Sequence, residues 1–367
     1  MKKTLMIKDT PVLEIDENLQ CKILDFDRLP FSLRKERVTG EDYYNWAANR
    51  ILPIDRIYAK EILNAYGLSQ SSHYDVFLKC RGFSLMDSYW IKEEDDTITW
   101  EKRNLFKNAI SLSIVETSLS GRTNIHSIPL NESRKKITEP TPELTTLGVN
   151  AKAWIRENEV LYLHKVGKNE IAANDILNAL DFKHIEYKLS TDEQISKYIS
   201  AERKGWLDGV GEKIVHSKIF TSEDKSFVSF EEIEKFCSFY NMDPIDVAIQ
   251  ISSQKYHEMQ VADYIMNNSD RHTQNWGFIM DNESGKLIDL CDLFDHDRAF
   301  HLSENLRSQT SYEESLEKSA VKSVGIIKPD FKKIVEMDKP ELMSDQQWNM
   351  VKNHVAILKD VLKTSSQ

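Results

Sequence analysis

The sequence predicts an α+β protein in which a mixed N-terminal domain precedes a strand-rich lobe and then a helical lobe. Three observations support this class. The polar stretch "PLNESRKKITEPTPEL" at residues 129–144 carries three prolines, which is typical of a linker between domains. Alternating apolar residues at 152–166 and 213–222 predict strands. Apolar residues at helical spacing dominate the chain from residue 230 onward.

Residues 1–135 are predicted to form the N-terminal domain. Aromatic residues are dense in "YYNWAANR" (43–50), "SLMDSYWIK" (84–92) and "ITWEKRNLF" (98–106), on mixed helix and strand patterns. Such residues usually fill a packed core. We therefore interpret this region as an accessory or docking domain without chemistry of its own.

The strand-rich lobe is predicted at residues 136–225. The segment "KAWIRENEVLYLHKV" (152–166) predicts two strands joined at "ENE", and the period of two places Leu161, Leu163 and Lys165 on one face. This lysine either extends to solvent at the strand end or serves an anionic ligand, and the pattern leaves both open.

A helix is predicted to follow at 169–182, with Glu170 in its first turn. A carboxylate there complements the helix dipole, so a surface role for Glu170 is an alternative to a functional one. The stretch "GWLDGVGEK" (205–213) is glycine-rich but does not lie between a strand and a helix as a dinucleotide loop would, and we predict a plain loop.

The helical lobe is predicted at residues 226–367. Helices are expected at 230–241 and 243–268, the second with Pro244 behind Asp243. The segment "FIMDNESGKLIDL" (278–290) predicts a hairpin that turns at "NESGK". A last helix at 344–362 opens with Ser344 and Gln347 as a capping box.

Composition narrows the class of protein. The formal net charge is −11, from 48 basic and 59 acidic residues, so the average surface repels nucleic acid and anionic lipid. Four cysteines without a CxxC pair argue against a zinc site and a disulfide framework. The sequence shows no export signal and no apolar run of membrane-spanning length, and a cytoplasmic location is expected.

One stretch concentrates groups that could carry chemistry, "NNSDRHTQNWGFIMDNESGKLIDLCDLFDHDRAF" at 267–300. A hairpin brings its two ends together, so Asp270, Asn275 and Asp295 are expected to converge. This order suits phosphoryl transfer, with one carboxylate as the base and an amide oxygen and second carboxylate holding magnesium.

Alternatives remain for the acidic and amide groups of this stretch. The pattern D-x-H-x-x-N is weak by itself, and an Asx turn at a helix end is the alternative for Asp270 and Asn275. Asp289, Asp292 and Asp297 are predicted to be exposed charges without a role.

The segment "IMNNSDRHTQNWGFIMDNESGKLIDLCDLFDH" resembles the catalytic core of the HipA-like serine/threonine kinases, a group related to the phosphoinositide-kinase-like branch of the kinase fold. Those proteins carry N-x-D-R-H-x-x-N-x-G, then a hairpin and an F-D or Y-D pair. The resemblance extends to "SLMDSYWIKEEDDTITWEKRNLF", "TPELTTLGVNAKAWI" and "KIFTSEDKSFVSFEEI" and covers most of residues 40 to 300.

This resemblance implies a bilobal HipA-like kinase fold and assigns roles to individual residues. Asp270 would be the catalytic base, and Asn275 and Asp295 would bind Mg²⁺. The resemblance also implies a set of nucleotide contacts: Lys165 on the ATP phosphates, Glu170 as the helix partner of Lys165, "TTLGVN" (145–150) with Gly148 as the turn over the phosphates, backbone near Ile219 and Phe220 for the adenine, and Thr145 and Thr146 as candidate autophosphorylation sites.

The expected activity is transfer of the γ-phosphoryl group of ATP to a serine or threonine hydroxyl of an unknown protein. By the same resemblance the chain could belong to a toxin–antitoxin pair, with an antitoxin or another regulatory protein as its partner. Two alternatives stay open: a lipid or small-molecule kinase, and a nucleotide-binding pseudokinase or interaction module.

Overall fold

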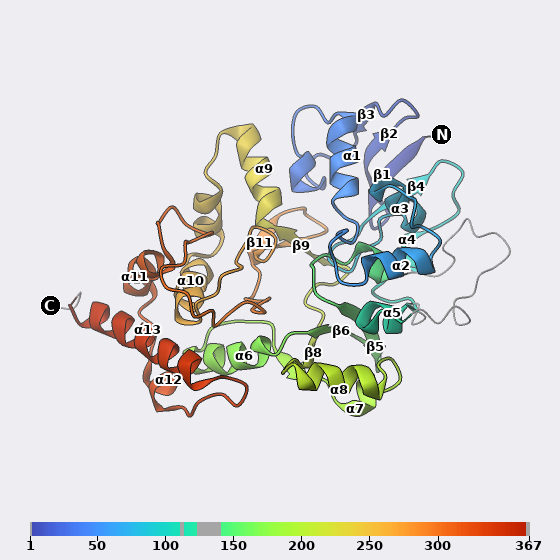
Figure 1. Ribbon diagram of the computed structural model, residues 1–367. Helices are drawn as coiled ribbons and strands as arrows, with labels where there is room; N and C mark the ends of the chain where they lie inside the picture. The colour runs from blue at the N-terminus through green and yellow to red at the C-terminus, as the bar shows by residue number, and fades with distance from the viewer. Residues whose placement is uncertain (1, 111–113, 123–140, 365–367) are drawn as a thin grey trace. The chain divides into compact units, whose positions relative to one another are not determined.

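The computed structural model describes residues 2–110, 114–122 and 141–364 (Figure 1). The chain forms two compact units, which are described in turn. Unit 1 comprises Met1–Val166, Ser190–Phe227 and Met280–Lys286, and unit 2 comprises Gly167–Leu189, Val228–Ile279 and Leu287–Gln367.

These units do not follow the three predicted ranges. The predicted accessory domain and most of the predicted strand-rich lobe fall within unit 1, whereas Gly167–Leu189 of that lobe belong to unit 2. The predicted boundary between residues 135 and 136, and the part of the predicted linker up to residue 140, lie outside the described residues. The three ranges therefore stay a prediction.

The α+β class is confirmed, and unit 1 holds the first of its sheets. This sheet has four antiparallel strands in the order β3-β2-β1-β4. Its strands are β1 Lys3–Ile7, β2 Thr10–Ile15, β3 Cys21–Ile23 and β4 Tyr89–Glu93, and the helices of this region are the 3-10 helix Phe31–Leu33, α1 Gly40–Ala48, α2 Ala59–Ala65, α3 His73–Cys80, α4 Trp100–Arg103 and α5 Val115–Ser120.

The predicted hairpin at 152–166 is confirmed and forms a second antiparallel sheet of unit 1 with β8. Asn158 and Glu159 make its turn with positive φ angles of 46° and 66°, at the predicted "ENE". The strands are β5 Lys152–Glu157, β6 Val160–Val166 and β8 Ile214–Lys218, and the remaining helices of unit 1 are the 3-10 helix Pro142–Thr145, α7 Asp192–Ile195 and α8 Ala201–Gly209.

The two faces of this hairpin pack into different cores. Trp154 and Leu161 lie in an aromatic cluster with Met6 and Trp90 of the first sheet. On the other face, Ala153 and its neighbour Ile155 pack with apolar residues of α5, α7 and α8. Because side chains alternate along a strand, one hairpin joins both cores.

The predicted loop at 205–213 is wrong over its first five residues, which belong to α8. Ser200 caps this helix by accepting a hydrogen bond from the backbone N–H of Arg203, and Leu207 is buried in the second core. Capping and packing outweigh the low helix propensity of the two glycines.

Unit 2 is mainly helical, and α10 contacts most of its other elements (Figure 1). Helices α11, α13 and α9 and strand β11 all pack against α10. Asp243 caps α10 with Pro244 at the first position, as predicted, whereas the non-helical Ser252 kinks the predicted single helix. The elements are α6 Asn169–Leu180, β7 Tyr187–Leu189, α9 Phe230–Tyr240, α10 Pro244–Ile265, β11 Leu287–Leu290, α11 Leu316–Ile327, α12 Lys332–Glu336 and α13 Asp345–Thr364.

The hairpin and the last helix also match their predictions. β10 Gly277–Asp281 and β11 are joined by a turn in which the N–H of Gly285 donates to the carbonyl of Asp281, and with β9 Lys225–Ser229 they form a sheet in the order β11-β10-β9. Ser344 and Gln347 form the predicted capping box before α13.

Within the described residues, no helix combines the length and apolar character needed to cross a membrane. All four cysteines are free thiols.

We expect Trp90→Ala to lower the free energy of unfolding by about 3–5 kcal/mol, because a large cavity replaces a buried ring. Trp90 is 1% exposed and stacks on Phe83 with ring centroids 5.2 Å apart. Urea unfolding followed by circular dichroism measures the loss. Trp206→Ala is the control, since Trp206 is 53% exposed and its removal should cost less than about 1 kcal/mol. Equal losses would contradict this account of the core.

Candidate functional site

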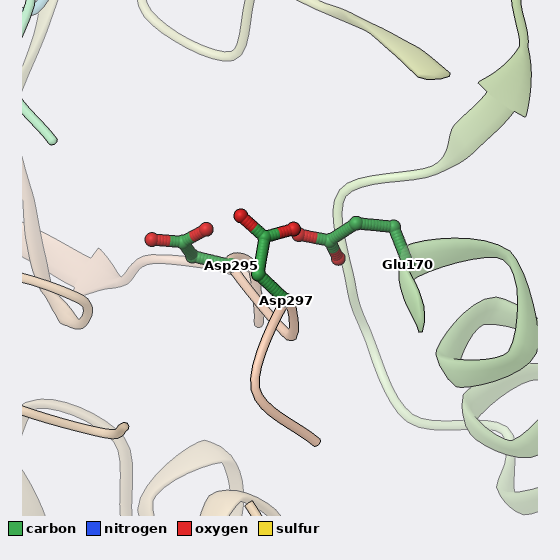
Figure 2. Close-up of side chains that lie close together, drawn as sticks. All are labelled: Glu170, Asp295 and Asp297. Atoms are coloured by element: carbon green, nitrogen blue, oxygen red, sulfur yellow. The ribbon is translucent and has the colours of Figure 1, made fainter. Parts of the chain in front are cut away.

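Three carboxylates of unit 2, from Glu170, Asp295 and Asp297, lie together (Figure 2). One oxygen from each lies within 4.8 Å of the others. Figure 2 shows the Asp297 side chain between the other two, with Glu170 coming from the start of α6. Asp295 adopts a left-handed backbone conformation, with a φ of 59°, which a short polar residue tolerates better than most.

The start of α6 holds the segment that carries both aspartates. The buried carboxylate of Glu170 accepts a hydrogen bond from the backbone N–H of His296 at 3.0 Å, and the ring Nδ1 of His296 lies 3.4 Å from its second oxygen. Asn169 donates from Nδ2 to the carbonyls of Asp297 at 2.7 Å and Ala299 at 3.1 Å. These contacts fix the backbone on both sides of Asp297.

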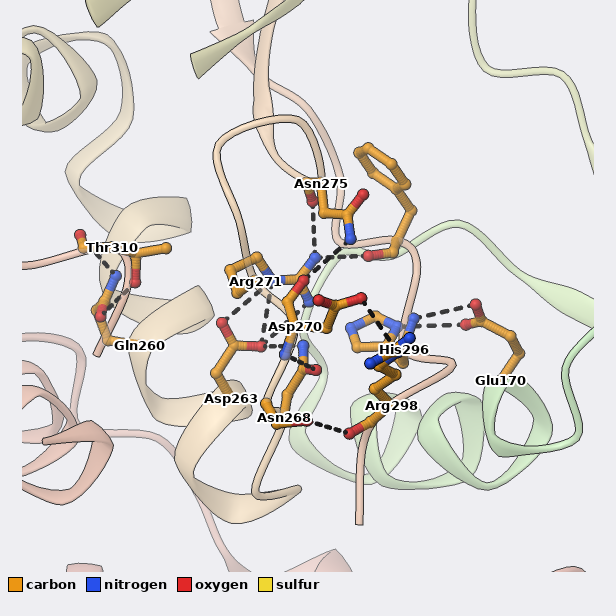
Figure 3. A network of polar contacts seen from close by, with 12 residues as sticks. Glu170, Gln260, Asp263, Asn268, Asp270, Arg271, Asn275, His296, Arg298 and Thr310 are labelled. Atoms are coloured by element: carbon orange, nitrogen blue, oxygen red, sulfur yellow. Dashed lines mark hydrogen bonds and ion pairs between the residues drawn. The ribbon is translucent and has the colours of Figure 1, made fainter. Parts of the chain in front are cut away.

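The loop after α10 is ordered by the last turns of that helix (Figure 3). Asn268 donates from its backbone N–H to the carbonyl of Asp263 at 2.8 Å and from Nδ2 to the Asp263 carboxylate at 2.9 Å. Its amide oxygen then accepts from the backbone N–H of Asp270 at 3.2 Å. The position of Asp270 is therefore set, through Asn268, by a buried carboxylate seven residues earlier in the chain.

Arg271 ties this loop to the segment that carries Asp295 (Figure 3). Its buried guanidinium pairs with Asp263, with Nη2 and Oδ1 3.1 Å apart. Nη1 donates to the carbonyls of Asn275 at 2.7 Å and Phe294 at 2.6 Å. Burial by itself lowers the pKa of Arg271, but attraction to Asp263, and more weakly to Asp295 and Glu170, raises it above its usual value.

Asp270 and Asn275 differ in their exposure. The Asp270 side chain is 37% exposed, and Nε of Arg298 lies 3.6 Å from its carboxylate. Asn275 is buried and donates from Nδ2 to the carbonyl of Asp270 at 3.0 Å, which turns its amide oxygen the other way. Asp270 is thus accessible to a substrate, and Asn275 can offer an oxygen to a cation.

The sequence prediction for Asp297 is wrong. It was expected to be an exposed charge, but it is half-buried and belongs to the carboxylate group. The hydrogen bonds from Asn169, which lies 128 residues earlier in the chain, cause this placement. By contrast, Asp289 and Asp292 are 44% and 38% exposed at their side chains and pair with Lys255, and their lack of a role stays a prediction.

The surface alternative for Glu170 and the solvent alternative for Lys165 are both excluded by burial, since Glu170 is 0% and Lys165 1% exposed. Lys165 lies in unit 1 and Glu170 in unit 2, and their predicted pairing stays a prediction. Directly opposite Lys165 on the neighbouring strand lies Lys152, which is also buried and which the sequence prediction missed. Two buried lysines on one face are a marked concentration of positive charge.

Gly148 has a φ of +93°, a conformation that glycine adopts readily, and its role in a turn over the phosphates stays a prediction. A Cβ atom at Gly148 would collide with Nζ of Lys152, so the absence of a side chain makes room for that ammonium group. The threonines before this turn are buried. Thr145 donates from Oγ1 to the carbonyl of Phe83 at 2.7 Å, and Thr146 donates to the carbonyl of Pro142 at 2.7 Å.

Autophosphorylation of Thr145 or Thr146 therefore requires this segment to leave its position, and it stays a prediction. Ile219 and Phe220 follow β8, and the backbone N–H of Ile219 donates to the carbonyl of Leu161 at 3.0 Å. Ile219 is partly buried against the aromatic cluster, as is Leu163, so this end of β8 offers an apolar surface.

Comparison with known proteins supports the fold. No family model and no curated protein matches the sequence. Among solved structures, the chain is similar to HipA from the toxin–antitoxin complex of Shewanella oneidensis MR-1 with HipB and operator DNA, with a TM-score of 0.55, 9% identity, and coverage of 99% of this chain and 97% of that one. The chain therefore has a HipA-like kinase fold.

A second solved structure, the proinflammatory kinase CtkA of Helicobacter pylori, is also similar, with 18% identity and a TM-score of 0.38. The matched region covers 58% of this chain and 93% of CtkA.

We expect Asp263→Asn to lower the free energy of unfolding by about 3–5 kcal/mol, because it leaves the Arg271 charge buried without its carboxylate. Replacing both residues, as Asp263→Leu with Arg271→Met, should recover part of the loss. Urea unfolding measures both. Glu314→Gln is the control, since it breaks the exposed pair with Lys318 and should leave the stability unchanged. A stability of Asp263→Asn equal to that of wild type would contradict the account.

We expect the buried carboxyl group of Glu143 to make the stability of the protein depend on pH. Burial raises its pKa to about 7, although hydrogen bonds and the Arg56 charge oppose this. The folded state therefore binds more protons than the unfolded state between about pH 4.5 and 7. The free energy of unfolding should fall by about 3 kcal/mol as the pH rises through this range. In Glu143→Gln this decrease should vanish in urea titrations from pH 4 to 8; an unchanged decrease would contradict the assignment.

Proposed function

We propose that this protein is an ATP-dependent kinase that transfers the γ-phosphoryl group to a serine or threonine hydroxyl of a protein. One observation carries the proposal: Arg271 binds the carbonyls of both Asn275 and Phe294, so the loop with Asp270 and Asn275 lies beside the segment with Asp295. This arrangement supports the proposal, because the candidate base Asp270 and the candidate oxygen donors Asn275 and Asp295 come from these two adjacent segments of unit 2.

In this proposal Asp270 orients the acceptor hydroxyl and takes its proton. Its carboxylate is partly exposed while its backbone is fixed by Asn268, so it can meet a substrate without losing its orientation. Arg298, whose side chain is 68% exposed, lies beside the same carboxylate and can move away when substrate binds.

Asn275 and Asp295 would hold Mg²⁺, with Glu170 and Asp297 as further oxygen donors beside Asp295. This donor set fits the ion, because Mg²⁺ prefers carboxylate and amide oxygens and keeps several of its waters. The metal would supply charge neutralisation on the phosphate oxygens. Glu170 also accepts from the His296 N–H, which fixes the backbone between the two aspartates.

The nucleotide would be bound by residues of unit 1: Lys165 and the Gly148 turn on the phosphates, and the backbone near Ile219 and Phe220 on the adenine. The burial of Lys165 supports this role, since a buried ammonium gains most from an anionic partner. Lys152, opposite it, adds positive charge in the same place.

The likeness to HipA also motivates the finer proposal that the chain is a toxin-type kinase with a regulatory protein partner, because that HipA was solved with HipB and DNA. We expect a regulatory protein that binds this chain to lower the rate of phosphoryl transfer in vitro when it is added in equimolar amount. A partner that forms a stable complex and leaves this rate unchanged would contradict the regulatory role.

We expect Asp270→Asn to lower the rate of phosphoryl transfer by at least about 10²-fold and to leave the affinity for ATP nearly unchanged, because a general base acts mainly on the reaction step. Labelled ATP with Mg²⁺, followed by mass spectrometry of the modified residues, measures transfer; calorimetry measures binding. Asp295→Asn should lower the rate of transfer and raise the Mg²⁺ concentration that gives half of the maximal rate, because it removes a proposed metal ligand.

Asp289→Asn is the matched control, since Asp289 lies in the same stretch and its carboxylate pairs with Lys255. It should retain the wild-type rate. Equal transfer by wild type and Asp270→Asn would exclude Asp270 as the base. ATP binding by a wild-type protein that transfers no phosphate to protein would favour a pseudokinase, and label on a lipid or small alcohol would favour the alternative substrate class.

A further inference from the structure

Arg56 lies in the region predicted to be an accessory domain without chemistry, yet its side chain binds the segment around Gly148. The guanidinium is buried, with 3% of the residue exposed. Nη1 donates to the carbonyl of Glu143 at 3.3 Å and to that of Thr146 at 3.2 Å, and Nη2 donates to the carbonyl of Lys152. One side chain thus holds backbone on both sides of the turn.

Backbone hydrogen bonds reinforce this contact. The N–H of Leu52 donates to the carbonyl of Leu144 at 2.9 Å, and the N–H of Ile57 donates to the carbonyl of Val149 at 2.8 Å. The segment 52–57 therefore runs beside the segment 144–149 and contacts it at two points five residues apart in each segment.

The charge of Arg56 suits this role. Burial lowers the pKa of Arg56 to about 10, partly offset by the nearby Glu143 carboxylate, so the guanidinium remains charged at neutral pH. Glu143 is itself fixed, because its carboxylate accepts from the backbone N–H of Trp154 at 3.1 Å. A planar group with several donors in fixed directions can hold three carbonyls at once, whereas an apolar side chain could only fill the space.

The turn needs such support. Gly148 has a positive φ, and the conformation of residues 146–152 decides where the backbone N–H groups and Lys152 are presented. An anion-binding turn acts through these directions, so a small change in its shape weakens phosphate binding.

We propose that Arg56 is a positioning residue for the turn at 146–152, so that the N-terminal segment 52–57 is a structural part of the nucleotide site. This inference rests on the proposed function, because it takes the Gly148 turn as the phosphate turn. It gives the N-terminal region a direct role in the affinity for nucleotides.

The test compares the affinities of wild type, Arg56→Met and Arg56→Lys for ATP, with and without Mg²⁺, and for adenosine, by titration calorimetry. We expect Arg56→Met to bind ATP about ten- to a hundred-fold more weakly, with an adenosine affinity within about three-fold of wild type, because only the phosphates depend on the turn. The ATP affinity of Arg56→Lys should lie between those of wild type and Arg56→Met, since one ammonium group can replace only part of the contacts of the guanidinium group. Low millimolar guanidinium ion should restore part of the ATP affinity of Arg56→Met.

Arg37→Met removes the same charge from an exposed position of unit 1 and is the matched control, with no expected change in either affinity. Circular dichroism and the unfolding midpoint check that each variant folds; if Arg56→Met does not fold, Arg56→Lys carries the comparison. A folded Arg56 variant that binds ATP and adenosine in the wild-type ratio would overturn the inference.

The two proposals can fail separately. A wild-type protein that binds neither adenosine nor ATP would contradict the proposed function. The positioning role is then tested by hydrogen exchange of peptides covering residues 142–152, which should exchange faster in Arg56→Lys than in wild type. Unchanged exchange there would overturn the inference on its own.

Discussion

The buried ion pair of Asp263 and Arg271 is the interaction on which the candidate site of unit 2 depends. Neither charge could remain buried alone, so the pair forms only where the end of α10 and the following loop adopt one arrangement. The remaining donors of Arg271 then select the positions of Asn275 and Phe294. A single guanidinium group thereby orders three separate segments, which carry or adjoin the residues proposed for catalysis.

A similar solution recurs in unit 1. Arg56 is buried among backbone carbonyls as Arg271 is, and it holds the Gly148 turn from a segment that lies about 90 residues earlier in the chain. In both places a guanidinium is used where several carbonyls must be held in fixed directions. Asp270, which is proposed to meet the acceptor hydroxyl, has a side chain that is 37% exposed, whereas Arg271 and Arg56 are buried.

Glu170, at the start of α6, is fully buried beside the segment 295–297. Its carboxylate is close to two others, which is unfavourable without compensating positive charge, and the hydrogen bond that it accepts from the backbone N–H of His296 supplies only part of that compensation. A group of carboxylates held together by the fold in this way is well suited to a divalent cation, and this fits the proposed magnesium chemistry.

By itself, the sequence determined the elements that depend on local patterns, namely the hairpins at 152–166 and 278–290 and the capped ends of helices α10 and α13. It missed Asp297, Lys152 and Arg56, because their surroundings come from residues distant in the chain. The alternation or spacing of apolar residues indicates which face of an element a residue occupies. The local sequence does not indicate which other segment covers that face. Only the tertiary structure decided that Glu170 and Lys165 are buried and that α8 extends through two glycines, since packing free energy there exceeds local preference.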